Sequence, residues 1–397
     1  MDKINVCNKT HKRTWAEIDI DAIKNNFNLI KTASKNKKVC CVIKADAYGH
    51  GAVQLARVYK ELGADLFAVS NIEEAIQLRE NGIDKDILIL GYTPPACAKL
   101  LSEYKIHQCV YSYSYGKALH DASIKAKVKI KIHLKIDTGM GRIGFICIDE
   151  KSNGLRNAVR VLQMPNFKVE GIFTHLAIAD EGENGKEFSL NQYQKFIFAK
   201  NYLENKGAKF KYHHCSNSAS ILDFPEFSDN TVRAGIILYG MDPSSEVINK
   251  VPLIPAMTLK TIVSHVKDVT AGQSISYGRT FIAKEKMRVA TLAIGYADGF
   301  LRGTYIEDRF VLINGHSAKI LGRVCMDQVM IDVTGVSCHV GDEVIIFGKE
   351  KGFTPNEVAK RIKTIGYELT CNVGYRVPKV YLENGRIVGY KNNLLEI

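Results

Sequence analysis

Long hydrophobic runs are missing from this 397-residue chain, and that absence is informative. No stretch approaches the roughly 18 uncharged apolar residues that would suggest a membrane-spanning helix, so we expect no membrane association. The first fifteen residues, MDKINVCNKTHKRTW, have scattered charges and no apolar segment of the kind found in a signal peptide. We therefore expect a cytoplasmic protein.

Metal-binding cysteine spacing and clustered basic charge are also missing. The ten cysteines include one tight pair, Cys40 and Cys41, which is adjacent rather than C-x-x-C, so reduced core thiols are expected. The 54 basic and 42 acidic residues leave a net charge of +12, but the lysines are spread along the chain. Only the KNKK run at residues 35–38 forms a small cluster, so we expect no nucleic-acid partner and no metal site.

The chain is long enough for two domains. Eight short apolar segments, from VCCVI to TVRAG, alternate with amphipathic stretches between residues 39 and 235. This alternation predicts an α/β fold, an N-terminal (β/α)8 TIM-type barrel. The segment MDPSSEVINKVPLIP holds three of the nine prolines, and after it the pattern becomes strand-like. We place the barrel at residues 1–245 and a mainly antiparallel β domain at residues 246–397. The first residues of the chain are expected to pair with the second domain.

Polar residues and glycines stand where the barrel strands should end. The run VCCVI ends in Lys44, and VEGIFTH and TVRAG end in His175 and in Arg233 to Gly235. Catalytic residues of such barrels lie at this carboxyl-terminal rim. A partly desolvated lysine there favours its neutral amine, which attacks carbonyl carbons. From the strand alone, a reactive amine and an ordinary surface lysine remain equally open.

Other motifs are individually ambiguous. KIDTGMGRIGF, residues 135–145, surrounds Arg142 with glycines, and a guanidinium suits a carboxylate. Ser218, with the amides near Gly235 and Ile236, follows the seventh and eighth strands, where barrel phosphate sites are often built. Tyr277 and Tyr375 lie beside glycines in the second domain, where a tyrosine alone is more often a core residue.

Together, nine motifs in order resemble the alanine racemases, pyridoxal phosphate enzymes of fold type III. They are VIKADAYGHG, KIDTGMGRIG, GIFTHLA, HCSNSA, TVRAGIILYG, SYGRTF, GYADGF, GRVCMDQ and GYRVPK, and they cover nearly the whole chain. The resemblance implies pyridoxal 5'-phosphate as cofactor and interconversion of L-alanine and D-alanine by two bases, supplying D-alanine for peptidoglycan.

The resemblance also assigns roles to individual residues. It implies that Lys44 holds the cofactor and is one base, that Tyr277 is the opposite base, and that His175 and Arg233 connect that tyrosine to the cofactor. It implies further binding residues: Tyr48, Ser218, Gly235, Ile236 and Tyr375 for the cofactor phosphate, and Arg142, Met326 and Asp327 for the substrate. Lys135 matches a lysine that is carbamylated in many members of the family.

The family forms head-to-tail dimers with shared active sites, so we expect a homodimer in which Tyr277, Met326 and Asp327 act on the partner's cofactor. Alanine is the expected substrate because the bulky Tyr375 favours a small side chain. Two alternatives remain open: a racemase of broader specificity, for serine or basic amino acids, and a non-catalytic pyridoxal phosphate-binding protein.

Overall fold

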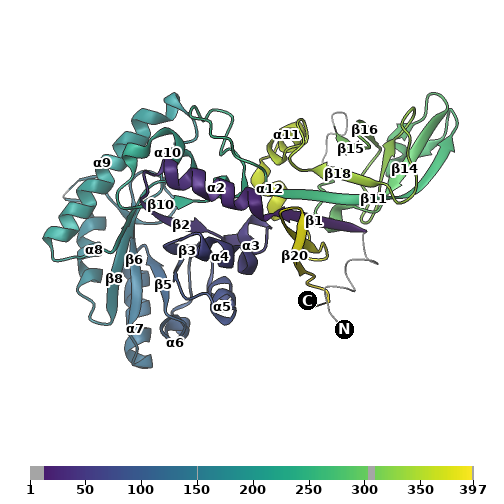
Figure 1. The fold of residues 1–397 in the computed structure, drawn as a ribbon. Coiled ribbons are helices and arrows are strands. Elements are labelled where there is room, and N and C mark those ends of the chain that lie inside the picture. Colours follow the sequence, from purple (N-terminus) through teal and green to yellow (C-terminus); the bar gives the residue numbers. More distant parts are fainter. Residues whose placement is uncertain (1–12, 150, 303–308, 396–397) are drawn as a thin grey trace.

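A parallel barrel and an antiparallel β domain lie side by side in the computed structural model (Figure 1). The structure describes residues 13–149, 151–302 and 309–395. Within them, eight parallel strands form one sheet in the order β10-β2-β3-β4-β5-β6-β8-β9. These strands are β2 (Lys38–Val42), β3 (Leu66–Val69), β4 (Asp86–Ile89), β5 (Ile106–Val110), β6 (Ile130–Asp137), β8 (Phe167–Phe173), β9 (Tyr212–His214) and β10 (Thr231–Ala234).

The barrel is nearly closed. The first and last strands of the ordered sheet, β10 and β9, are linked where the Arg233 amide donates to the Ser216 carbonyl at 3.3 Å. Strand bodies such as those of β3 and β5 are wholly buried, because helices cover the outer face while side chains fill the interior. The predicted barrel is confirmed, since all eight expected strands are present.

Helices follow most barrel strands, and one helix, α2, precedes the first of them. They are α2 (Ile20–Ala33), α4 (Ala52–Glu61), α5 (Ile72–Glu80), α6 (Ala98–Glu103), α7 (Tyr113–Ala126), α8 (Asn153–Leu162), α9 (Glu183–Asn205) and α10 (Ser218–Asp223). Helix α2 begins after Asp19, whose carboxylate accepts a hydrogen bond from the Ala22 amide at 2.9 Å. It buries Ile23, Phe27 and Ile30, the apolar face expected from their spacing.

The second domain is built on a mostly antiparallel sheet. Its strands run in the order β14-β17-β16-β15-β18-β11-β1-β19-β20 among the described residues. They are β1 (Thr14–Asp19), β11 (Met257–Val269), β14 (Met287–Leu292), β15 (Phe310–Ile313), β16 (His316–Leu321), β17 (Val329–Asp332), β18 (Glu343–Phe347), β19 (Lys379–Glu383) and β20 (Arg386–Lys391). The small hairpin β12 (Ser274–Ile275) and β13 (Phe281–Ile282) stands apart from this sheet.

The two domains are tied together at both ends of the chain. Strand β1 pairs antiparallel with β11 and parallel with β19, so the first described strand belongs to the second sheet. Helices α11 (Pro355–Arg361) and α12 (Gly366–Cys371) lie at the junction with the barrel (Figure 1). Helix α11 has Thr354 as its cap and Pro355 in its first turn, as expected. The division at residue 245 stays a prediction.

Candidate active site

Lys44 lies where strand β2 ends at the carboxyl-terminal rim of the barrel. The Ile43 amide before it donates to the Ala68 carbonyl of the neighbouring strand at 2.9 Å, which fixes the backbone that delivers the side chain. Lys44 is half-buried. Burial, followed by the charge of Arg142, lowers the pKa of Lys44 from its ordinary value. The amine therefore spends more time in its neutral, nucleophilic form than a surface lysine does.

A one-turn left-handed helix, α3 (Lys44–Tyr48), follows immediately. Ala45, Asp46, Ala47 and Tyr48 have φ between 51° and 55°. This conformation costs roughly 1–2 kcal/mol per residue for L-amino acids, so the surrounding structure must hold it. Because the turn joins Lys44 to Tyr48, it sets the positions of both side chains.

Asp46 connects this turn to the second domain. Its carboxylate lies 3.0 Å from the Lys379 Nζ of β19 and 3.3 Å from the Lys391 Nζ of β20. It also accepts a hydrogen bond from the Ala52 amide at 2.8 Å. Although burial opposes it, the charge of Lys379 contributes to a lowered pKa at Asp46. The sequence alone assigned no role to Asp46.

Tyr48, Ser218 and Gly235 surround one small space, which we call the anion cradle. The Gly235 amide donates to Ser218 Oγ at 3.0 Å. A Cβ added to Gly235 would lie 3.0 Å from Tyr48 Oη and 3.5 Å from Ser218 Oγ, so a side chain would fill the cradle. Ile236 begins the short helix that follows Gly235. The structure thus brings together, at one point of the rim, four residues that the sequence predicted for phosphate binding.

Arg233 and His175 form a buried polar pair beside the cradle. Arg233 is only 4% exposed. Its Nη2 group donates to His175 Nδ1 at 3.0 Å and to the Thr174 carbonyl at 2.8 Å. Burial, followed by the charge of Arg233, holds the pKa of His175 well below its usual range. His175 is therefore neutral, and its single proton must lie on Nε2 because Nδ1 accepts.

Lys135 is a buried amine without a hydrogen-bond partner. It is 3% exposed, and its Nζ is unpaired among the described residues. Its Nζ lies over the Phe173 ring, 5.0 Å from the ring centroid. Burial, followed by the charge of Arg233, lowers the pKa of Lys135 to about 7. The neutral amine is therefore much easier to form at this position than in an ordinary lysine.

Arg142 is exposed on the glycine-rich loop after β6. The Asp137 carboxylate shapes this loop by accepting hydrogen bonds from the amides of Gly139 at 2.9 Å and Gly141 at 3.1 Å. The charge of Arg142 acts on the pKa values of Lys44 and Lys135. Several cations therefore converge at this rim, where they favour anionic ligands.

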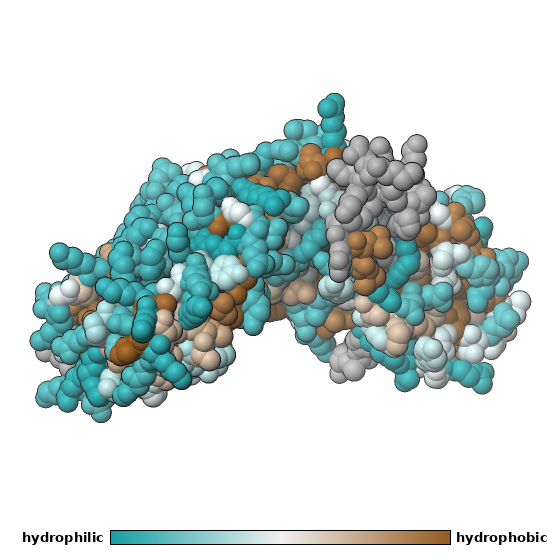
Figure 2. All heavy atoms as spheres, turned by 90° about the horizontal axis from the view of Figure 1, so that it is seen from below, coloured by the Kyte–Doolittle hydropathy of each residue, from teal (hydrophilic) through white to brown (hydrophobic). Residues whose placement is uncertain are grey.

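The predicted residues of the second domain are exposed in the single chain. Tyr277 is 63% exposed, Met326 52% and Tyr375 68%. None of the described hydrogen bonds, ion pairs or ring contacts joins Tyr277 to the barrel. The Tyr375 hydroxyl donates to the Asn393 carbonyl at 3.0 Å. Figure 2 shows a mostly hydrophilic face that hydrophobic patches interrupt.

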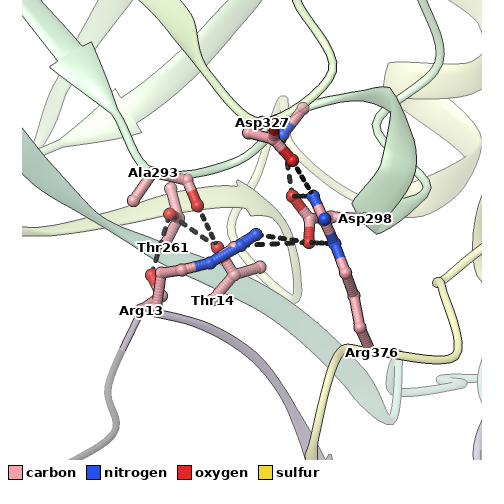
Figure 3. Close-up of polar contacts among 8 residues, drawn as sticks. Arg13, Thr14, Thr261, Ala293, Asp298, Asp327 and Arg376 are labelled. Carbon is pink, nitrogen blue, oxygen red and sulfur yellow. Dashed lines mark hydrogen bonds and ion pairs between the residues drawn. The ribbon is translucent and has the colours of Figure 1, made fainter.

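Asp327 belongs to a network of charges in the second domain. Arg376 lies between two carboxylates, donating to Asp327 at 2.6 Å and to Asp298 at 2.7 Å (Figure 3). Arg13 also pairs with Asp298, at 2.5 Å. The loop that carries Met326 is tied further by the Ala297 amide, which donates to the Met326 carbonyl at 3.1 Å. The network orients this loop, and one oxygen of the Asp327 carboxylate is already bound by Arg376.

Fold and site together define a class: a two-domain barrel enzyme that presents a lysine amine next to an anion cradle. Residues 18–243 match the alanine racemase N-terminal domain family, and residues 256–381 match the alanine racemase C-terminal domain family. The alanine racemase of Clostridium tetani is 43% identical over 382 residues, which are 95% of this chain and 97% of that protein.

Solved structures agree. The alanine racemase of Clostridium difficile 630 is 40% identical, with a TM-score of 0.91 over 97% of this chain and 100% of that one. The Bacillus anthracis alanine racemase with bound L-Ala-P is 36% identical, with a TM-score of 0.90 over 98% and 99% of the two chains. This chain belongs to the alanine racemase family and is an isomerase.

Proposed function

We propose that this protein interconverts L-alanine and D-alanine by a two-base mechanism with pyridoxal 5'-phosphate as cofactor. The observation that most supports the proposal is the position of Lys44 at the barrel rim, on the same turn as Tyr48 of the anion cradle. The lowered pKa of Lys44 supports a nucleophilic role for its amine. The relatives reported above are named as alanine racemases, which supports the same substrate.

The residues present fit the cofactor. The space at Gly235, which a Cβ would fill, is bordered by the hydroxyls of Tyr48 and Ser218 and suits a phosphate group. With the Ile236 amide and Tyr375, these residues would hold the phosphate. Lys44 would form the covalent link. Arg233 would face the pyridine nitrogen, and because guanidinium keeps its proton, it would leave that nitrogen unprotonated.

When bound, the cofactor withdraws electrons from the α-carbon of the amino acid and so lowers the cost of removing its proton. Lys44 accepts or returns that proton on one face, and its lowered pKa makes the neutral, proton-accepting amine easier to form. Tyr277 of a second protomer does so on the other face. The 63% exposure of Tyr277 in one chain leaves it accessible to such a partner.

Substrate recognition rests on charge and shape. Arg142 of one protomer and the backbone at Met326 of the second protomer bind the substrate carboxylate, and Asp327 follows Met326 directly in that second protomer. Lys135 becomes a carbamate when its neutral amine attacks carbon dioxide and its nitrogen releases one proton. The carbamate anion then orients Arg142. The unpaired Nζ and the pKa of about 7 support this assignment.

Organisation and cellular role complete the proposal. We infer two domains, at residues 1–245 and 246–397, and a head-to-tail homodimer. We also infer a cytoplasmic location and a role in supplying D-alanine for peptidoglycan. No helix within the described ranges has the length and apolarity needed to cross a bilayer. Racemisation of serine or basic amino acids is the second candidate, and Tyr375 argues against large side chains.

Solvent deuterium exchange at Cα tests the mechanism. We expect Lys44→Ala to suppress exchange mainly from D-alanine and Tyr277→Phe to suppress it mainly from L-alanine, since each base serves one face. Serine and lysine as alternative substrates measure specificity. Equal loss from both isomers in each variant would contradict the two-base assignment, and a fully active monomer in sedimentation would contradict the shared site.

A further inference from the structure

A line of three buried histidines crosses the interior of the barrel. His107 Nδ1 lies 3.0 Å from His133 Nε2, and His133 Nδ1 lies 3.0 Å from His214 Nε2. His214 Nδ1 accepts a hydrogen bond from Arg233 Nη1 at 3.1 Å. All three imidazoles are 0% exposed. The line therefore reaches the candidate active site entirely through the protein interior.

The other end of the line is Asp86, at the amino-terminal end of the barrel. Asp86 is the first residue of β4, and its Oδ1 lies 3.3 Å from His107 Nε2. The two atoms are close enough for an ion pair, but their geometry does not meet the angular criteria for a hydrogen bond. Asp86 also receives hydrogen bonds from Lys211 at 2.7 Å and Tyr212 at 2.8 Å. His107, followed by Lys211, holds the pKa of Asp86 well below its usual range, so the carboxylate is charged.

Asp86 at one end of the line and Arg233 at the other allow only one arrangement of the three imidazole protons. A carboxylate only accepts hydrogen bonds, and a guanidinium only donates them. Burial, as the largest cause, lowers the pKa of each of the three histidines, so each is neutral and carries one proton. Since Arg233 donates to His214 Nδ1, the proton of His214 lies on Nε2, and the same reasoning applies to His133 and His107.

Arg233 has a particular need for such acceptors. Beyond the two imidazoles, its side chain donates to the carbonyls of His214 at 2.7 Å, Thr174 at 2.8 Å and Cys215 at 3.1 Å. No carboxylate contacts it within the part of the chain that the structure describes. Burying an unpaired charge is costly, and aligned imidazole dipoles that end at a carboxylate reduce that cost.

Local packing leaves room for the line. A Cβ added to Gly171 of β8 would lie 2.5 Å from His133 Nδ1, so glycine is needed beside that imidazole. The His214 ring stacks on Phe173, with centroids 4.8 Å apart and an interplanar angle of 5°. These contacts restrict the orientations that the His133 and His214 rings can adopt.

We propose that Asp86, His107, His133 and His214 form a positioning relay that acts on the active site from the opposite end of the barrel. The relay holds the His214 acceptor toward Arg233, and Arg233 in turn fixes His175 with its proton on Nε2. Its catalytic consequence rests on the proposed function, whereas its proton arrangement does not.

Neutron diffraction on deuterated crystals of the cofactor-loaded protein tests the arrangement directly. We expect deuterium on Nε2, and none on Nδ1, of His107, His133 and His214. Deuterium on Nδ1 of His133 or His214 would overturn the relay. This readout needs no racemase activity, so it stands even if the proposed function fails, and wild-type turnover of alanine tests that function separately.

Kinetics of Asp86 variants test the consequence. We expect Asp86→Asn to lower kcat about 10-fold and to change KM less than about twofold. Effects of this size are typical of residues that position catalytic groups without contacting the substrate. Asp86→Glu, which keeps the negative end, should recover most of the loss. Asp84→Asn is the matched control, because that carboxylate is exposed and pairs with Lys60. Wild-type kcat in Asp86→Asn, or equal loss in Asn and Glu variants, would refute the positioning role.

Discussion

The ion pairs of Asp46 are expected to hold the left-handed turn that carries Lys44 and Tyr48. Replacing Asp46 with alanine leaves Lys379, 5% exposed at its side chain, as a buried ammonium without its nearest carboxylate. Breaking a buried pair from one side costs about 3–5 kcal/mol. Because the Asp46 side chain is 33% exposed, solvent screens part of this cost, and we expect about 2–3 kcal/mol of destabilisation.

A double-mutant cycle separates the pair from the packing around it. In Lys379→Met the buried cation is removed, so adding Asp46→Ala to this background should cost at least about 1 kcal/mol less than in the wild type. Urea unfolding followed by near- and far-ultraviolet circular dichroism measures each variant. If the two single losses add within about 0.5 kcal/mol, the ion pair does not hold the turn.

The pH dependence has a defined sign. The pKa of Asp46 is lower in the folded protein than in the unfolded chain, so its contribution is complete above about pH 4, the ordinary range of an aspartate. It is lost as the pH falls through the folded-state pKa. The stability difference between wild type and Asp46→Ala should therefore be constant from about pH 5 to 8 and shrink below about pH 4. A difference that already shrinks near pH 6 would contradict this cause.

Two further predictions concern the anion cradle and the buried lysine. Gly235→Ala places a Cβ 3.0 Å from Tyr48 Oη, so the affinity for the cofactor should fall about 10-fold while the fold is kept. Titration with pyridoxal 5'-phosphate measures this affinity. An unchanged affinity would show that Gly235 is not part of the cradle. Depleting bicarbonate should lower kcat/KM of the wild type reversibly, whereas Lys135→Met should be insensitive to bicarbonate; equal sensitivity of both proteins would exclude a carbamate at Lys135.

Much of the fold was predictable because its signals are local. Parallel strands buried on both faces are continuous apolar runs, and the eight expected runs all form barrel strands. Helix α11 was predictable from Thr354 and Pro355, a cap and a first-turn proline. The turn α3 was not predicted, since a run of positive φ values at Ala45 to Tyr48 has no periodicity and contains no glycine.

The histidine relay left only a weak signal in the sequence. His107, His133 and His214 are each a polar residue within an apolar strand, which indicates an interior hydrogen bond but not its partner. Their pairing depends on the order of β5, β6, β9 and β10 around the barrel. No local pattern encodes which inward-facing side chains meet.

The residue types at the strand ends can be read directly from the chain, and in an ordered set of motifs they were enough to predict family, fold and candidate site. The chemical state of those residues depends on how the chain folds. The lowered pKa of Lys44 and the neutral form of His175 arise from burial and from charges on other segments of the barrel, Arg142 and Arg233. The ion pairs of Asp46 are made with Lys379 and Lys391, which lie more than 300 residues away in the sequence. Desolvation and long-range pairing exist only once the barrel closes against the second domain, and so they are absent from any local pattern.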